Sequence, residues 1–533
     1  MSLQNGRYTA TKPLHVAEGW SLERLTPQSR LFGANGLRTG PDGRVYVAQV
    51  AGSQISALDI GTGQLETISA VGSDVVAPDD VAFDPAGNLY ITEYYDGRVS
   101  VRSVDGRTRV LCDDVPGANG ITVHKGRLFV DECRIGGRLL ELDLNGGAPR
   151  VLLENLMMPN ALEAGPDGKL YFPVLGTNEI CRIDPEGGAS ERVVGDLGGP
   201  TAVKFDGKGH IVSTQVGSGQ VLRIDPRTGD RTVLASLPPG IDNLTFVGDR
   251  LFVSHFTGTI AEILSDGKTR TVVPGGLSWP LDVAMADDGN LYIADGHHMF
   301  VIPPGGTLQI VAMFMSPGFP GNVRGLAAVG GGELIVTTAN GQVSRYRPAA
   351  SESEVLAEGL DQIYGVAVAP GGGVAVAELG TGRVLSVKGG KVEVLASNLK
   401  SPVGVAFAAD GTCFVSEQGA GRVVKLNGSS TETVLDGLQQ PQGLLVHDGQ
   451  LYVVDAGKKT LTQLDLKTKA RSIVVSELPV GAPAGVTPKP LRGIAPFTGP
   501  QGPFAGITAG KDGTLYLSAD AEGSVLSLRK ARR

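Results

Sequence analysis

The sequence predicts an all-β fold: two six-bladed β-propellers in tandem, with twelve four-stranded blades. Three observations support this prediction: twelve copies of one sequence pattern, a regular spacing between the copies, and four short alternating segments within each copy. The spacing is 39 to 44 residues at every step but the last, where it is 63. Four-stranded units of this length are typical of propeller blades. Because closed rings usually hold four to eight blades, we divide the twelve copies into two rings of six.

Each copy begins with a short segment that leads into an apolar strand, as in GANGLRT at 33–39 and GANGITV at 117–123. In the second copy we expect strands at VAFDP, NLYITEY, RVSVRSV and TRVLCD, and the turns between strands carry pairs such as DG and AG. These pairs accept the positive φ angles of tight hairpin turns. A single blade cannot bury both of its faces, so neighbouring blades must stack radially around a channel.

The two ends of the chain predict how the rings close. The last copy stops after its third strand, SVLSLRK, and an extra strand in LHVAEGWSLERL precedes the first copy. We expect residues 1–267 to form the first propeller, with the N-terminal strand completing the blade that begins at GIDNLTF. Residues 268–533 would form the second, with the TRTVVPG strand completing the last copy. The alternative pairs the N-terminal strand directly with the last copy; both arrangements remove an open edge by a strand swap.

A Pro/Gly-rich stretch at 479–503 accounts for the long final interval. Its sequence, PVGAPAGVTPKPLRGIAPFTGPQGP, favours no regular structure. Long loops in compact domains tend to be lids or binding loops. We expect this loop to lie over the second channel.

Composition and charge exclude several classes of partner. The formal charge of −8 argues against nucleic acid, which needs a basic face, and no stretch approaches the 18 apolar residues of a membrane span. The four cysteines form no CxxC pair, so a thiolate metal site is not expected. The first residues lack the apolar core of a signal peptide. We therefore expect a cytoplasmic protein that acts on a small molecule, and the sequence identifies no protein partner.

One position of each copy, here called the axial position, lies two residues before the first apolar residue of the innermost strand. In the first ring all six axial residues carry a side-chain oxygen: Asn35, Asp79, Asn119, Asn160, Thr201 and Asp242. In the second ring they are Leu281, Arg324, Tyr364, Val403, Gln442 and Ala505. Oxygen ligands around one axis suit a hard cation, Ca²⁺ or Mg²⁺. Asn and Asp are also ordinary turn residues that bind nearby backbone groups, so both interpretations stay open.

Two further sets of residues are candidates for chemistry. The end of the second strand holds Glu93, Glu132 and His255 in the first ring, where one of them could act as a general base. The alternative is that this position faces water on the blade rim. In the second ring, Arg324 and Tyr364 share an otherwise rather apolar mouth. These two residues predict either a pocket that binds an organic anion or a contact between them that supports the fold.

The repeats resemble the NHL and SMP-30/gluconolactonase/virginiamycin-B-lyase group of propellers. PNALEAGPDGKLYF is similar to the PNG…PDG…LY signature of SMP-30-like lactonases, and FDPAGNLYITEYYDGRVSV resembles the lyase and NHL blades. Such lactonases bind a divalent cation at the axis through a Glu, two Asn and an Asp. The resemblance maps Asn119 and Asn160 onto the two Asn. It places Asn35 at the position of the metal-binding Glu and Thr201 at the position where the metal-binding Asp is expected. Asp242 comes one blade after that position.

The leading functional hypothesis is a metal-dependent enzyme of the lactonase or lyase type that works at the first axis. It assigns Asp79, Asn119, Asn160 and Asp242 to the metal, and Asp242, Glu93 and His255 to catalysis. The expected substrate contacts are Asn35, Thr201, Arg324 and Tyr364. The alternative is a non-catalytic ligand-binding or protein-interaction scaffold, which has no need of six oxygen-bearing side chains at one mouth.

Overall fold

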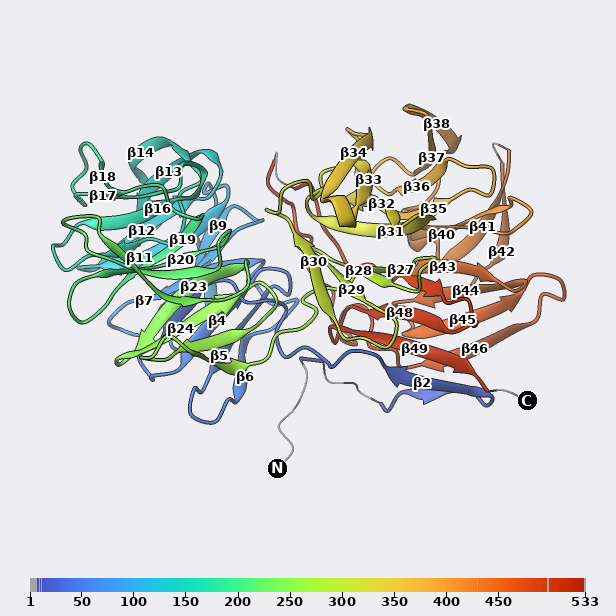
Figure 1. Cartoon of the computed structure of the whole chain (residues 1–533), viewed down its shortest axis with the longest axis horizontal. Coiled ribbons are helices and arrows are strands. Elements are labelled where there is room, and N and C mark those ends of the chain that lie inside the picture. The colour runs from blue at the N-terminus through green and yellow to red at the C-terminus, as the bar shows by residue number, and fades with distance from the viewer. Residues whose placement is uncertain (1–6, 9, 11, 429, 496–497, 532–533) are drawn as a thin grey trace. The chain divides into compact units, whose positions relative to one another are not determined.

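Antiparallel strands make up most of the described chain, which comprises residues 7–8, 10, 12–428, 430–495 and 498–531 of this computed structural model. Within these residues, 49 strands form twelve sheets, eleven of four strands and one of five. Three 3-10 turns interrupt them, η1 (Leu175–Thr177), η2 (Pro348–Ala350) and η3 (Gln418–Ala420). The predicted pair of six-bladed propellers is confirmed, and Figure 1 labels its strands. No helix among the described residues is long and apolar enough to cross a membrane.

The first ring contains blades 1 to 6 in chain order, and each blade uses four consecutive strands. They are β3–β6 (Leu37–Thr39, Val45–Gln49, Gln54–Leu58, Leu65–Ser69), β7–β10 (Pro78–Phe83, Leu89–Glu93, Arg98–Arg102, Thr108–Cys112), β11–β14 (Ala118–His124, Arg127–Glu132, Ile135–Leu142, Arg150–Met157), β15–β18 (Glu163–Ala164, Leu170–Val174, Glu179–Ile183, Glu191–Val194), β19–β22 (Pro200–Phe205, Ile211–Gln215, Gln220–Ile224, Arg231–Ser236) and β23–β26 (Ile241–Val247, Arg250–His255, Ile260–Ile263, Thr269–Val273).

The second ring contains blades 7 to 12. They are β27–β30 (Asp282–Met285, Leu291–Asp295, His298–Ile302, Gln309–Met313), β31–β34 (Val323–Gly330, Glu333–Thr338, Val343–Arg347, Glu352–Ala357), β35–β38 (Ile363–Val368, Val374–Glu378, Arg383–Lys388, Lys391–Ala396), β39–β42 (Pro402–Phe407, Cys413–Glu417, Arg422–Asn427, Ser430–Leu435), β43–β46 (Pro441–His447, Gln450–Asp455, Thr460–Asp465, Arg471–Ser476) and β47–β49 (Ile507–Ala509, Leu515–Ala519, Ser524–Lys530).

The hydrophobic core of each ring lies in the seams between neighbouring blades. Between blades 6 and 1, for example, Leu37 and Val45 pack against Phe252 and Ile260. Because each sheet has two apolar faces, every blade contributes to two seams. The periodic apolar residues that reveal the repeats are the residues that fill these seams.

Each ring is also held together by hydroxyl groups that cross from one blade to the next. A Ser or Thr on a second strand donates to the backbone carbonyl of the next blade's axial residue, at 2.6–2.9 Å. This contact occurs at six of the twelve joints: Thr92–Asn119, Thr214–Asp242, Ser254–Asn35, Thr337–Tyr364, Ser416–Gln442 and Ser518–Leu281. Two of these joints close the rings, blade 6 on blade 1 and blade 12 on blade 7. The hydroxyls therefore fix the backbone from which the axial side chains project.

The strand that closes a ring differs from the leading prediction. The N-terminal strand β2 (Trp20–Arg24) pairs with β49 of blade 12, from Trp20 opposite Lys530 to Arg24 opposite Leu526 (Figure 1). β26 remains in blade 6, paired with β25 through a tight hairpin. The expected strand swap at the first ring is therefore wrong, and the alternative pairing of the N-terminal strand is correct. The physical reason is local: a hairpin at an Asp-Gly turn forms before a distant strand can compete for the same edge.

The N-terminal segment also extends the neighbouring blade. The two-residue strand β1 (His15–Val16) pairs with β46 of blade 11, with His15 opposite Ser476. Leu14, Trp20 and Leu22 pack against the core between blades 11 and 12. The segment therefore joins the outer edges of two blades of the second ring.

The two compact units do not follow the predicted division at 267 and 268. One unit comprises residues 30–278 and 487–494, and the other comprises residues 279–486, the described part of 495–531 and the described residues up to Ser29. The expected boundary falls inside the β25–β26 hairpin, which cannot be divided without breaking a sheet. The loop at 479–503 is divided too: residues 487–494 belong to the first unit, where Arg492 lies 3.4 Å from Asp96, and only its last part covers the second channel.

Candidate functional site

Contacts and charge proximity bring together the axial residues of five blades of the first ring: Asn35, Asp79, Asn119, Thr201 and Asp242. In four of these blades the pairing of the first two strands shifts register at the axial position. Such β-bulges bend a strand and redirect its side chains. The same shift occurs in four blades of the second ring, so the bulge belongs to the fold. The axial side chains of the first ring retain 3–9% of their exposure, so they nearly fill a narrow mouth.

Amide groups of the mouth bind its two carboxyl groups. Asn119 Nδ2 donates to Asp79 Oδ2, and Asn35 Nδ2 donates to Asp242 Oδ2 at 3.3 Å. Asn160 differs, because its Nδ2 contacts the Cys133 sulfur at 3.5 Å and its Oδ1 accepts the Ala161 N–H at 2.8 Å. The structure therefore brings Asn35, Asp79, Asn119 and Asp242 into two amide–carboxyl pairs.

The carboxyl groups at this mouth hold their protons unusually tightly. Burial, and then the proximity of Asp242, Asp80 and Asp131, keeps the pKa of Asp79 well above its ordinary value. Burial also raises the pKa of Asp242 to about 7, with Asp80 adding to the rise and the Asn35 amide opposing it. Excess negative charge in a buried place favours either protons or a cation.

Two further buried carboxyl groups lie near this mouth. Asp131 has a pKa of about 8, mainly because it is buried, and burial likewise raises the pKa of Asp80. One oxygen of each, Oδ2, has no hydrogen-bond partner within the described chain. These unpartnered oxygens, together with the amide and carboxyl oxygens of the axial residues, are the hard donors that Ca²⁺ or Mg²⁺ prefers. The residues thus fit a divalent cation in chemistry, although no three His, Cys, Asp or Glu side chains of the described residues group closely enough to hold a metal by themselves.

A buried ion-pair network crosses the first ring on its inner strands. Arg38 donates to Glu163 at 2.6 Å and to the carbonyls of Val81 and Ile121, so it contacts three other blades. Lys204 lies 2.5 Å from the same carboxylate. Burial alone would raise the pKa of Glu163, but Lys204 and Arg38 lower it to about 2. The network therefore links the inner strands of five blades of the first ring.

Glu93 does not have the free carboxylate that a general base needs. The side chain is fully buried, and it accepts the Val76 N–H at 2.6 Å, the Arg98 guanidinium at 2.7 Å and the Ser100 hydroxyl. Other blades use the same position to bind the backbone that precedes the axial residue. The corresponding acceptors are Gln49, Gln215, Asp295, Glu378, Glu417 and Asp455. The position at the end of the second strand therefore supports the scaffold, and the alternative of a water-facing rim is also wrong for Glu93.

His255 and Thr201 are likewise engaged with the scaffold. His255 Nε2 donates to the Pro239 carbonyl at 2.9 Å, and Nδ1 accepts the Thr257 N–H at 3.0 Å. Burial lowers the pKa of His255 to about 4, so the ring is neutral at pH 7. The Thr201 hydroxyl donates to the Asp242 carbonyl at 2.6 Å. These contacts support structural roles for His255 and Thr201.

The structure adds two residues to the first mouth that the sequence did not single out. The Tyr94 hydroxyl donates to the Cys133 carbonyl at 3.2 Å. Burial, followed by the proximity of Cys133, Tyr95, Asp79 and Asp242, holds the pKa of Tyr94 well above its ordinary value. Tyr94 and Cys133 directly follow Glu93 and Glu132, at equivalent places in blades 2 and 3. The residues at this position differ from copy to copy, so no recurring pattern in the sequence marks it.

The mouth of the second ring places Arg324 against Tyr364, as the expected pair. The guanidinium carbon lies 4.4 Å from the centre of the Tyr364 ring. Beneath this mouth the channel is a cavity of about 280 Å³, walled by small and apolar residues such as Ala284, Ala327 and Ala367. Within the described chain, the lining of this cavity contains one carboxyl group, Asp282, and no basic side chain.

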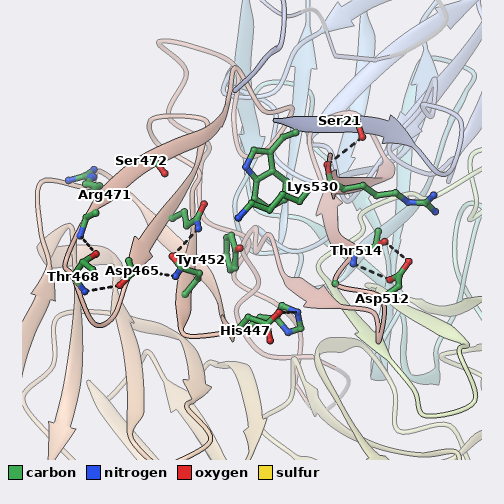
Figure 2. Close-up of a pocket in the computed structure, with 17 residues that line it drawn as sticks. Ser21, His447, Tyr452, Asp465, Thr468, Arg471, Ser472, Asp512, Thr514 and Lys530 are labelled. Atoms are coloured by element: carbon green, nitrogen blue, oxygen red, sulfur yellow. Dashed lines mark hydrogen bonds and ion pairs between the residues drawn. The ribbon is translucent and has the colours of Figure 1, made fainter. Parts of the chain in front are cut away.

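A larger groove, of about 900 Å³, lies where β2 closes blade 12 against blade 11. Figure 2 shows part of its lining, including Tyr452, Asp465 and Lys530. The Trp20 and Tyr452 rings meet edge to face, and Gln450 donates to Asp465 at 2.8 Å. Most of its polar groups bind one another, and none of its residues has a buried polar atom left without a partner within the described chain. We assign no chemistry to this groove.

Residues 14–256 match the family described as SMP-30/Gluconolactonase/LRE-like region. Among solved structures, a streptogramin B lyase shares 18% identity, with 55% of this chain and 98% of that chain covered and a TM-score of 0.39. Virginiamycin B lyase from Staphylococcus aureus shares 17% identity, with 53% and 96% covered and a TM-score of 0.38. A chain of a nidogen/laminin complex shares 24% identity over 37% of this chain and 78% of that chain, with a TM-score of 0.34. A comparison with curated proteins gave no match.

Proposed function

Because residues 14–256 form an SMP-30/gluconolactonase-like region, we propose that the first propeller is a metal-dependent enzyme of the lactonase or lyase type. Its substrate would be a lactone or a related carbonyl compound, and its reaction hydrolysis, elimination or isomerisation. The observation that carries the proposal is the convergence of Asp79 and Asp242, each bound by an amide, at a mouth where burial raises both pKa values.

Asp79, Asn119, Asn160 and Asp242 would hold a divalent cation at the axis. When bound, the cation would polarise the substrate carbonyl or stabilise the negative charge that develops on its oxygen. The carboxyl oxygens would then be ionised, since a nearby cation favours the charged form.

The remaining groups of the mouth would bind and orient the substrate. Asn35 keeps one oxygen of Asp242 fixed, which leaves Asp242 as the group best placed to take a proton from water or substrate. Tyr94 offers a hydroxyl beside the same carboxyl groups and is an additional positioning residue. The Arg38–Glu163–Lys204 network would hold in place the inner strands that carry these residues.

The test combines metal content with turnover in single variants. Asn119→Ala and Asn160→Ala should lose bound Ca²⁺ or Mg²⁺ by elemental analysis and should lose hydrolysis of a panel of γ- and δ-lactones, followed as acid release. Val403→Ala, at the axial position of the second ring, is the matched control and should retain both. Full activity in both Asn variants would exclude the first mouth as the active site.

A non-catalytic scaffold is the second candidate, and the narrowness of the mouth favours it. The axial side chains leave little open surface, which suits a bound ion more readily than a substrate. Stoichiometric metal without turnover on any lactone, lost in Asn119→Ala, would support this alternative.

A further inference from the structure

Arg324, in the mouth of the second ring, is a buried cation without a counter-ion. Its side chain is 1% exposed, and its Nη1 atom has no hydrogen-bond partner within the described chain. Nη2 donates to the backbone carbonyl of Pro500, and the face of Tyr364 lies beneath the guanidinium at 4.4 Å. A carbonyl dipole and an aromatic face offset only part of a full positive charge.

The first ring shows how the same fold accommodates an arginine on an inner strand. Arg38 is only partly buried, with 15% of its side chain exposed, yet it binds the Glu163 carboxylate at 2.6 Å and two backbone carbonyls. The carboxyl group of the second channel, Asp282, makes no such pair. Its two oxygens accept the backbone N–H groups of Val283 and Leu326, at 2.9 Å each. No carboxylate of the described residues pairs with Arg324 in the way that Glu163 pairs with Arg38.

The last part of the loop, residues 498–503, covers Arg324 through few contacts. The Gly499 N–H donates to the Ala339 carbonyl at 2.9 Å, and Gln442 Nε2 reaches the Pro503 carbonyl at 3.4 Å. A side chain at Gly502 would place its Cβ 2.9 Å from the Tyr364 hydroxyl, so glycine permits this close approach. The Pro500 carbonyl thus sits where the oxygen of an anion would bind the guanidinium.

We propose that the mouth of the second propeller binds the carboxylate of a small organic acid, which takes the place of the Pro500 carbonyl on Arg324. A carboxylate presents two oxygens to the planar fork of a guanidinium, whereas the carbonyl presents one, so the exchange also satisfies Nη1. Tyr364 supports the guanidinium from below and offers an aromatic edge to a planar ligand. The site is separate from the mouth proposed for lactone chemistry, and its function does not depend on that proposal.

Benzoate is a suitable probe, with benzamide as the uncharged analogue of the same shape. Isothermal titration of the full-length protein should give saturable binding of benzoate at one site and at least tenfold weaker binding of benzamide. Arg324→Met should weaken benzoate binding at least tenfold, and Arg324→Lys should weaken it as well, because an ammonium lacks the fork. Arg345→Met, at an arginine already paired with Glu354, is the matched control and should leave binding unchanged.

Thermal unfolding distinguishes a role of Arg324 in ligand binding from a role in stabilising the fold. Arg324→Met should unfold at the same temperature as the parent, or higher, in buffer without benzoate, because it removes an unpaired buried charge. Failure of the parent to bind benzoate, or equal binding in a folded Arg324→Met, would each overturn the proposal. If Arg324→Met does not fold, the parent titration and Arg324→Lys decide the question. Asn160→Ala, in the first ring, should bind benzoate normally whether or not it is active on lactones.

Discussion

Removal of the closing strand should destabilise the second propeller while leaving the first intact. The perturbation is deletion of residues 1–26, which contain β1 and β2. β2 supplies the fourth strand of blade 12, paired with β49 over five residues. Without it, β49 becomes an open edge, and the apolar seam between blades 11 and 12 loses its outer cover.

The magnitude can be worked from the contacts that disappear. Trp20 and Leu22 pack against the blade 11–12 core, and burying a large apolar side chain fully stabilises by about 1.5–3 kcal/mol, so two partly buried ones contribute about 2–3 kcal/mol. About five backbone hydrogen bonds at about 0.5–1.5 kcal/mol each add about 2–7 kcal/mol. Glu522, 1% exposed, also loses its ion pair with Arg24 at 2.9 Å. The total, about 5 kcal/mol or more, approaches the whole stability of an ordinary domain.

Tryptophan fluorescence provides an assay for this unit alone. The sequence contains two tryptophans, Trp20 and Trp279, and both belong to the second unit. In the truncated protein only Trp279 remains, and its unfolding transition should move to much lower temperature. Calorimetry should still show the transition of the first unit near its original position. A truncated protein whose Trp279 signal melts within a degree or two of the parent would refute this reasoning.

Three further perturbations test the first ring. Burial makes Asp242 bind its proton more tightly in the folded protein than in the unfolded chain. The free energy of unfolding of the metal-free protein should therefore fall by up to about 4 kcal/mol as pH rises from about 4 to about 7. Asp242→Asn should reduce this dependence of the unfolding free energy on pH, as measured by denaturant titration. Glu163→Gln should lower the free energy of unfolding by about 3–5 kcal/mol, because Arg38 and Lys204 would lose the carboxylate that they share. An unchanged melting temperature would contradict a stabilising role for this ion-pair network. Ser254→Ala should lower the free energy of unfolding by about 1–3 kcal/mol, because it removes the hydroxyl that binds blade 6 to blade 1. Equal stability of variant and parent would show that apolar packing alone closes the ring.

The repeat pattern predicts the blades well, because the apolar residues that pack between neighbouring blades recur in every copy. It predicts poorly which strand completes the last blade of each ring. β2 (WSLER) alternates apolar and polar residues, and β26 (TRTVV) is rich in β-branched residues, so either sequence suits a strand beside β49. The choice depends on which strand already has a partner, and β26 has one in its own hairpin. The pattern carries no information about that competition.

The candidate site shows the same limit. The axial position could be identified because its residue type differs between the rings at a fixed place. Glu93 was assigned to catalysis because carboxylates suit bases, but its partners Arg98 and Ser100 lie on the next strand and bind it only in the folded blade. Tyr94 and Cys133 occupy a position whose residues vary from copy to copy, and no recurring pattern marks it.

The pairing of β2 with β49 also sets the order in which the chain can fold during synthesis. β2 is synthesised before the strands of both rings, and its partner β49 is synthesised after them. In the interval the six blades of the first ring are made, and blade 6 can close on blade 1 through their own contacts. The second ring cannot close until β49 has been synthesised. β2 therefore waits, with its apolar residues exposed, while the strands of both rings are made.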